Sequence, residues 1–213
     1  MKKYELTAEF IEQWGKKLFR IKALISFGSV EAGELGGYVE KEDNLAQDGD
    51  AWVCDNAWVC DNARVYGNAW VCDDARVYGN ARVCDNAWVC DNARVYGNAW
   101  VYGDARVYGN ARVCDNVMVC DNAWVCDDAD YLLIGRIGSR FSFTTFFKNK
   151  DKGITVSCGC FLGTIAEFRA KVTDTHGNNK HAKMYNLAAD MAELQILGEE
   201  YFDKLNTNKS EPF

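Results

Sequence analysis

Residues 51–74 read "AWVCDNAWVCDNARVYGNAWVCDD", which is one six-residue unit written four times with small changes. Thirteen such hexads follow one another from Ala51 to Asp128, and two weaker ones precede them between Val39 and Asp50. The first and third positions are Ala and Val, the second is Trp or Arg, and the fourth is Cys or Tyr, with only Val117 and Met118 departing. Repetition at a fixed period indicates a repeat architecture and outweighs local propensities.

A six-residue period does not fit a helix of 3.6 residues per turn, because the apolar positions would drift around the cylinder. It fits a short strand in which alternate side chains face opposite sides, followed by a corner of Gly, Asp or Asn. The second position carries six arginines, which an apolar interior could not accommodate. We therefore predict that Ala and Val point inward and that the larger residues point outward.

Three strand-corner units close one triangular coil of 18 residues, so the fifteen hexads predict about five coils. The small residue followed two places later by an aliphatic one resembles the left-handed parallel β-helix of hexapeptide-repeat proteins. The expected fold is all-β: a left-handed parallel β-helix over residues 39–128, with a β-rich cap at 1–38 and an α+β cap at 129–213. The caps would cover coil ends that otherwise invite polymerisation.

Two helices are expected in the second cap. Thr164 and Glu167 have the spacing of a capping box, and Ile165, Phe168 and Val172 follow on one face. A second helix is predicted over residues 180–198, with large apolar residues at helical spacing as its packing face: Met184, Leu187, Met191 and Leu194.

The chain also resembles a family of uncharacterised bacterial and prophage proteins. The shared features are "LFRIKAL" and "GELGGYVE" before tandem repeats of the VYGNARVYGNA type, and "IGSR", "TTFF" and "VSCGCF" after them. This resemblance implies a phage or prophage context without an agreed activity. The present chain differs in having Cys-Asp in place of many Tyr-Gly pairs and Trp in place of many arginines.

The net charge and the positions of the cysteines limit the partners and the cellular compartment that we expect. The formal net charge of −7 argues against direct binding to nucleic acid or to an anionic membrane, and no apolar run is long enough for a membrane span. The amino-terminal "MKKYELTAEF" lacks the apolar stretch of a secretory signal. Eight of the ten cysteines recur at one repeat position, so we expect reduced thiols in the cytoplasm of a bacterial host.

Side chains 18 residues apart should stack, which defines the outward columns. We define the tryptophan face by the column Trp52, Trp70, Trp88, Arg106 and Trp124, beside fourth-position Cys and Tyr residues. An exposed apolar stripe of this kind suits a partner protein or a second copy of the chain, and the resemblance to β-helix proteins favours a trimer. The alternative is that the indoles merely stack on one another. The predicted partner-binding residues are Trp52, Trp70, Trp88 and Trp124.

The arginine–tyrosine face is the neighbouring column of Trp58, Arg76, Arg94 and Arg112 with Cys60, Tyr78, Tyr96 and Cys114. Guanidinium groups beside aromatic rings suit a nucleotide-like anion. The alternative is that corner aspartates neutralise these arginines or that they lie over tyrosine rings. The predicted ligand-binding residues are Arg76, Arg94, Arg112, Tyr78 and Tyr96.

The sequence offers few candidate catalytic residues. Hexapeptide acyltransferases use a histidine as general base, and the two histidines here, His176 and His181, lie outside the repeats. Thiols in a straight column do not converge as zinc ligands do, so neither a metal nor a cofactor is expected. We predict a non-catalytic scaffold of phage type that binds itself or a host protein, with a nucleotide sponge and an acyltransferase as the alternatives.

Overall fold

The computed structural model describes residues 2–198, which divide into two compact units. Of these, the first unit holds residues 2–122 and 126–128, and the second holds residues 123–125 and 129–198. Among the described residues, no helix combines the length and the apolar character needed to cross a membrane.

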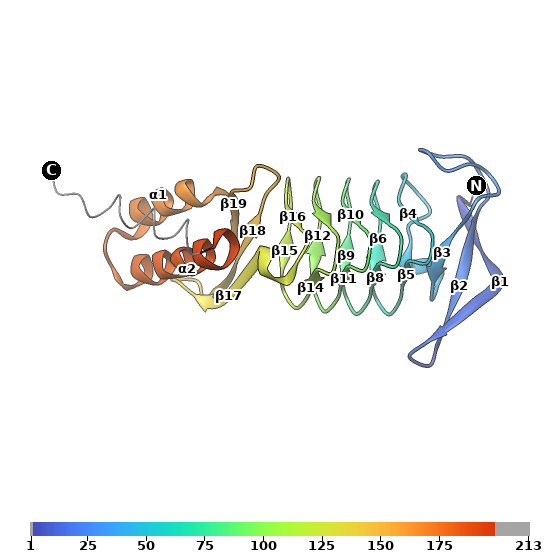
Figure 1. Ribbon diagram of the computed structural model, residues 1–213, viewed down its shortest axis with the longest axis horizontal. Helices are drawn as coiled ribbons and strands as arrows, with labels where there is room; N and C mark the ends of the chain where they lie inside the picture. The colour runs from blue at the N-terminus through green and yellow to red at the C-terminus, as the bar shows by residue number, and fades with distance from the viewer. Residues whose placement is uncertain (1, 199–213) are drawn as a thin grey trace. The chain divides into compact units, whose positions relative to one another are not determined.

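The first unit begins with a β cap. Strands β1 (Tyr4–Gln13) and β2 (Lys16–Ala23) form an antiparallel hairpin, and β2 pairs with β3 (Leu35–Val39). Strand β3 then pairs in parallel with β5, so the cap and the coils share one sheet of order β1-β2-β3-β5-β8-β11-β14 (Figure 1). A short 3₁₀ turn at Glu42–Asn44 leads into the coils.

The repeats form a parallel β-solenoid of about five turns, with one two-residue strand in each hexad from Ala51 onward. Residues 18 apart pair in register, as Trp70 with Trp88 and Arg76 with Arg94, so each coil uses three hexads. The described coils therefore confirm the three-sided architecture, while a left-handed coil stays a prediction. The two-residue coil strands of the first unit are β4 (Trp52–Val53), β5 (Trp58–Val59), β6 (Arg64–Val65), β7 (Trp70–Val71), β8 (Arg76–Val77), β9 (Arg82–Val83), β10 (Trp88–Val89), β11 (Arg94–Val95), β12 (Trp100–Val101), β13 (Arg106–Val107), β14 (Arg112–Val113) and β15 (Met118–Val119).

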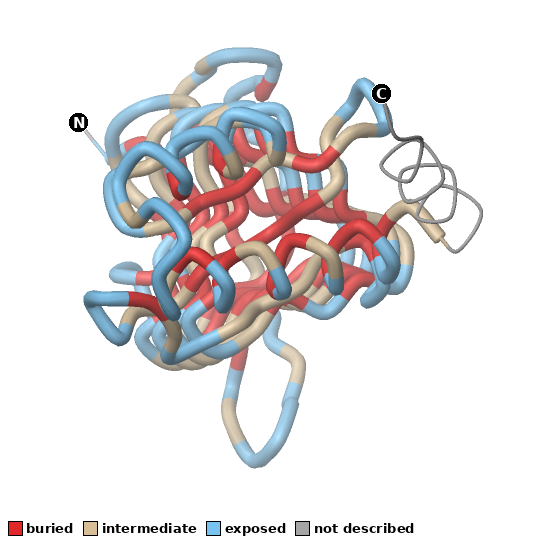
Figure 2. The backbone as a smooth tube through the Cα atoms, turned by 90° about the vertical axis from the view of Figure 1, so that its left-hand side faces the viewer, coloured by how far each residue is buried: buried red, intermediate tan, exposed pale blue. Residues whose placement is uncertain are grey.

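The interior of the coils is filled by the first and third positions, as predicted. Every Ala and Val at these positions from Ala51 to Val119 is at most 1 % exposed. Figure 2 shows these buried segments in red, alternating with pale corners. Burial of small aliphatic side chains in a narrow tube is the main apolar contribution to the stability of this unit.

The corners depend on the fifth position. Asp occupies it with φ between 52° and 62° at residues such as Asp73 and Asp91, and Gly with φ between 64° and 72° at residues such as Gly97. A Cβ added at Gly97 would lie only 2.7 Å from the backbone nitrogen of Asp115, so this corner needs glycine. Sixth-position amides add ladders along the corners, for example Asn80 Nδ2 donating to Asn98 Oδ1 at 3.0 Å.

The second unit combines an antiparallel sheet with two helices. After β16 (Trp124–Val125) and a 3₁₀ turn (Asp128–Asp130), the sheet runs β17 (Tyr131–Ile137), β18 (Ser142–Lys148), β19 (Ile154–Cys158) and β20 (Phe161–Thr164). Helix α1 (Ile165–His176) starts at the predicted capping box, in which the Glu167 amide donates to the Thr164 hydroxyl at 3.3 Å. Helix α2 (Lys180–Leu197) follows, and Phe168, Val172 and Tyr185 pack with Phe146 of the sheet.

The prediction of which side of α2 packs against the rest of the second unit is wrong. Met184, Leu187, Met191 and Leu194 are 39 %, 64 %, 57 % and 45 % exposed. The helix instead buries its small residues, including Ala188, Ala189 and Ala192, together with Tyr185 and Ile196. Alanines allow the helix to approach the sheet closely, so the larger side chains are left on the opposite side.

Candidate functional site

The outward columns predicted from the repeat are present in the first unit. The side chains of the tryptophan face in the first unit lie on β4, β7, β10 and β13. In these strands Trp52 pairs with Trp70, Trp70 with Trp88, and Trp88 with Arg106. The arginine–tyrosine face has its side chains on β5, β8, β11 and β14. In-register pairing of parallel strands places equivalent side chains about 4.8 Å apart, which makes each column continuous.

Trp52 does not belong to an exposed surface, contrary to the prediction. Its side chain is 0 % exposed because Tyr4 and Phe27 of the β cap pack edge-on against it, with ring centroids 6.3 and 5.4 Å away. The amino-terminal cap therefore covers the first rung of the tryptophan face. The four-indole stripe is accordingly shorter than the sequence suggests.

Trp70, which is half-buried, and Trp88, which is exposed, are the indoles of the tryptophan face in the first unit that the cap does not bury. Their rings are stacked with centroids 5.9 Å apart and an interplanar angle of 19°, and Trp88 is 46 % exposed. Trp124 lies in β16 of the second unit and is 37 % exposed, and its place in the same column stays a prediction. Stacking between Trp70 and Trp88 shows that the ladder interpretation applies to this pair, and the exposed ring of Trp88 still leaves apolar area for a partner.

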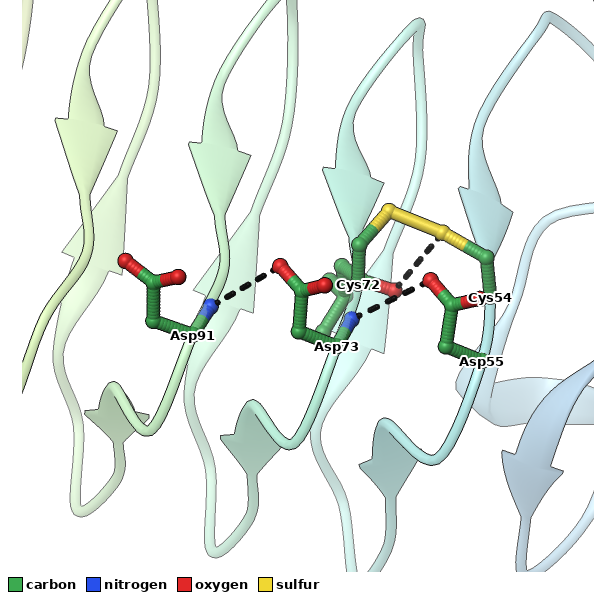
Figure 3. Close-up of a disulfide and its surroundings, with 6 residues drawn as sticks. Cys54, Asp55, Cys72, Asp73 and Asp91 are labelled. Atoms are coloured by element: carbon green, nitrogen blue, oxygen red, sulfur yellow. Dashed lines mark hydrogen bonds between the residues drawn. A yellow bond between two sulfur atoms is a disulfide. The ribbon is translucent and has the colours of Figure 1, made fainter.

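Cys54 and Cys72 form a disulfide on the tryptophan face, so the expectation of reduced thiols is wrong for this pair (Figure 3). Register brings their Cα atoms to 4.7 Å, within the range that a disulfide requires. Beside it, the carboxylates of Asp55 and Asp73 accept hydrogen bonds from the amides of Asp73 and Asp91 at 3.3 and 3.1 Å. The corner is thus braced by a ladder of carboxylate-to-amide bonds as well as by the covalent link.

The arginine–tyrosine face carries a larger aromatic cluster. Tyr78 and Tyr96 are stacked with centroids 4.9 Å apart and nearly parallel planes at 3°. Trp14, from the turn of the β1–β2 hairpin, packs edge-on against Trp58 and Tyr78 at 4.9 and 5.0 Å. Trp14 was not predicted to lie on this face, although an aromatic residue before a glycine in the polar stretch "EQWGKK" is a signal of a hairpin turn that carries a contact.

The arginines of this face are less neutralised than expected. Arg76 lies over the ring of Trp58, with its Cζ 5.7 Å from the ring centroid. Within residues 2–198, no carboxylate lies within ion-pair distance of Arg76 or Arg94. The corner carboxylate that precedes them in the column, that of Asp61, is paired with Lys16, which lowers the pKa of Asp61. The two following corners are Gly79 and Gly97.

The tyrosines of this face add no charge near neutral pH. A hydrogen bond with Cys114, followed by burial, raises the pKa of Tyr96 to about 12. Burial also raises the pKa of Tyr78. The face therefore combines two uncompensated guanidinium groups with two neutral, stacked phenol rings.

On the third face, formed by β6, β9, β12 and β15, several of the large side chains contact one another. Arg82 lies over the ring of Trp100 at 5.8 Å, and Trp100 Nε1 donates to Cys84 Sγ at 3.3 Å. Tyr102 packs against the same indole at 5.1 Å. These internal contacts leave less of the face for a partner.

Three groups of possible metal ligands occur on the coils, and each has its atoms otherwise engaged. Cys54 and Cys72 are oxidised, and Glu40 and Asp61 hold Lys16. In the third group, Asp73 and Asp91 accept backbone hydrogen bonds. Burial raises the pKa of Cys90 in that group to about 11, so its thiol is protonated near neutral pH. These contacts give no reason to propose a resident metal at the three groups.

The two histidines lie in the second unit. His176 is the last residue of α1, and its ring stacks on Tyr185 at 5.8 Å. His181 follows in the first turn of α2, with its ring centroid 5.7 Å from that of His176. Both contacts are structural, and His176 also lines a cavity that is described below.

The repeats are similar to a known solenoid repeat. They match the model of the YdcK beta solenoid repeat. The matched segments are residues 57–73, 75–91, 87–103, 101–114 and 111–127. All five lie in the repeat region, so the similarity concerns the solenoid and not the flanking regions. A comparison with curated proteins finds no match for the chain.

Proposed function

We propose that the protein is a non-catalytic scaffold that binds a second copy of itself through the tryptophan face. The observation that carries this proposal is the stacked pair Trp70 and Trp88, of which Trp88 is nearly half exposed on a flat parallel sheet. Tryptophan is among the residues that contribute most to protein–protein binding when it sits at the centre of an interface. A fixed stack also costs little conformational entropy on binding.

The charge distribution favours a copy of the same face as the partner. The protein has a net charge of −7, yet the second-position residues of this face in the first unit include one charged side chain, Arg106. A straight, apolar column can pack against the same column of another copy without burying unpaired carboxylates. The resemblance to trimeric β-helix proteins favours a trimer, and a host protein is the other partner that this face suits.

Light scattering tests the proposal. The wild-type protein is expected to show a multiple of its 24.0 kDa chain mass. Replacing both Trp70 and Trp88 by Ala should return it to the monomer, because the exposed stack is lost. Trp100→Ala on the third face is the matched control and should leave the mass unchanged. A monomeric wild type, or a double variant with the wild-type mass, would overturn the proposal.

The non-catalytic part of the proposal is tested separately with acetyl-CoA and a panel of acceptor amines and alcohols. The shared tube architecture makes acyl transfer the enzymatic alternative. No release of free CoA above the uncatalysed rate is expected. Turnover that disappears in His176→Gln would contradict the non-catalytic assignment and favour the acyltransferase instead.

A second candidate function rests on the arginine–tyrosine face. Arg76 and Arg94 lie in adjacent coils beside the stacked rings of Tyr78 and Tyr96, and no carboxylate in the described part of the chain is within ion-pair distance of either. Uncompensated like charges at this spacing repel each other, so an anion with a flat ring would relieve the repulsion and stack on the phenols. Thermal shifts with a panel of nucleotides test it: Arg94→Ala should abolish any shift, and Arg64→Ala on the third face should not.

A further inference from the structure

The second unit contains a cavity that the functions proposed above do not use. It has a volume of about 360 Å³ and lies between α1, the turn after β17 and the turn between β19 and β20. This volume is within the range of small-molecule sites. All of its lining residues belong to the second unit, so the cavity is complete within one chain.

The floor of the cavity is aromatic. Phe168 is buried, and its ring contacts those of Phe161 and Tyr185, each with centroids 5.6 Å away. The imidazole of His176 stacks on Tyr185. These rings hold one another in place, which gives a pre-formed apolar surface that can accept the flat body of a ligand.

The rim of the cavity is cationic. Arg140 and Lys171 are among its lining residues, together with the hydroxyl groups of Ser139, Ser142 and Thr175, and no Asp or Glu lines it. This is unusual in a chain with 31 acidic and 24 basic residues. Within the described residues, no carboxylate lies within ion-pair distance of Arg140, and Lys171 holds only Asp174 in an exposed pair at 3.2 Å.

Arg140 also reaches toward the aromatic floor. It lies along the turn of Gly159, where a Cβ would come within 3.1 Å of its Nη1 atom. Burial raises the pKa of Tyr185, and the positive charge of Arg140 acts on that hydroxyl in the opposite direction. A guanidinium and a neutral phenol therefore face the same space above the rings.

We propose that this cavity binds a small organic anion whose carboxylate or phosphate contacts Arg140 and Lys171 and whose aromatic body lies on Phe161, Phe168 and Tyr185. The guanidinium supplies paired donors that suit either anionic group. The rings exclude water from one side of the ligand, which strengthens the charge-assisted contacts on the other. The site is separate from both faces of the solenoid.

Calorimetric titration of the full chain with phenyl phosphate, benzoate and benzyl alcohol tests the proposal and distinguishes the two anionic groups. At least one of the two anions is expected to bind. The neutral alcohol should bind at least about tenfold more weakly. Arg140→Gln should weaken anion binding about tenfold, because one charge-assisted contact is lost. Arg140 is exposed, so this variant should fold normally.

Two controls locate the site. Arg136→Gln changes an exposed arginine of β17 that does not line the cavity, and it should bind like the wild type. The chain has 2 histidines, so the imidazole signal of His176 can be assigned with a His181→Gln variant and should shift on addition of the anion. Replacing Trp70 and Trp88 should leave binding intact, which separates this test from that of self-association.

Three results would overturn the inference. The first is an absence of binding by both anions at millimolar concentration. The second is binding of benzyl alcohol as tight as that of the anions. The third is wild-type affinity in Arg140→Gln.

Discussion

At the scale of single residues, the fifth position of each hexad carries most of the strain of the coil. Asp91 holds φ at 57°, a region that L-residues enter at a cost, and its carboxylate accepts a hydrogen bond from the Gly109 amide at 2.9 Å. Its amide in turn donates to Asp73 at 3.1 Å. The side chain thus offsets part of the backbone cost with a bond that a longer or branched residue could not make.

Asp91→Val is therefore expected to destabilise the protein by roughly 2–3 kcal/mol, because a β-branched residue is strained at positive φ and the carboxylate bond is lost. Asp91→Asn keeps both the tolerance of positive φ and an acceptor, so it should cost less than about 1 kcal/mol. Urea unfolding of the two variants measures the difference. Equal stabilities would contradict the role given to this corner.

Two buried thiols and the half-buried thiol of Cys90 make the stability of the protein depend on pH in the alkaline range. Burial raises the pKa of Cys60 to about 12, and of Cys90 and Cys120 to about 11, from an ordinary value of 9.0. As the pH rises above 9.0, the unfolded chain loses these protons and the folded chain keeps them, so the free energy of unfolding should fall. Lys3 acts in the opposite direction, since burial lowers its pKa to about 8, but it is one group against three.

Urea unfolding at pH 8 and at about pH 10 tests this expectation, and Cys60→Ala should make the loss of stability smaller. Cys160→Ala is a suitable control because that thiol is exposed. A free energy of unfolding that stays constant or rises over this interval would count against the buried state of these thiols.

Much of this residue-scale pattern was predictable. The alternation of small and large residues indicated that one side of each strand faces the interior, and the arginines indicated which side faces outward. The burial of Ala and Val was therefore predicted correctly. The burial of Trp52 was not predictable from the repeat, because it depends on Tyr4 and Phe27, which are distant in sequence. The Cys54–Cys72 disulfide was likewise not predictable, because it depends on the register and oxidation of two thiols, whereas the recurrence of cysteine at one repeat position suggested reduced thiols.

At the scale of elements, α2 shows where periodicity misleads. The helix has two apolar sides, one of large residues and one of alanines, and helical spacing alone does not decide between them. The side with Ala188, Ala189 and Ala192 packs on the sheet, and the side with Leu187 and Met191 faces outward. Close packing favours the small side because it brings the helix axis nearer to the sheet.

The consequence is testable by substitution on each side. Leu187→Gln should change the free energy of unfolding by no more than about 0.5 kcal/mol, since the side chain is 64 % exposed. Ala189→Leu should cost roughly 1–3 kcal/mol, because the position is 0 % exposed and has no room for the added carbons. The reverse order of effects would restore the packing face predicted from the sequence.

At the scale of the whole molecule, the solenoid separates stability from function. Ala and Val in the interior and Gly, Asp and Asn at the corners determine the fold, so the second and fourth positions are free to vary among Trp, Arg, Cys and Tyr. This freedom explains why the fold was predictable and the partner was not. The chemistry of each face depends on which residues coincide every 18 positions and on what the caps cover.

Self-association through the tryptophan face is the central functional claim, and hydrogen–deuterium exchange at low and high protein concentration tests it most directly. Raising the concentration is expected to slow amide exchange in β7 and β10, around Trp70 and Trp88, with little change in β6 and β9 of the third face. Slowed exchange confined to any other face, or no change while the molecular mass rises, would contradict the claim.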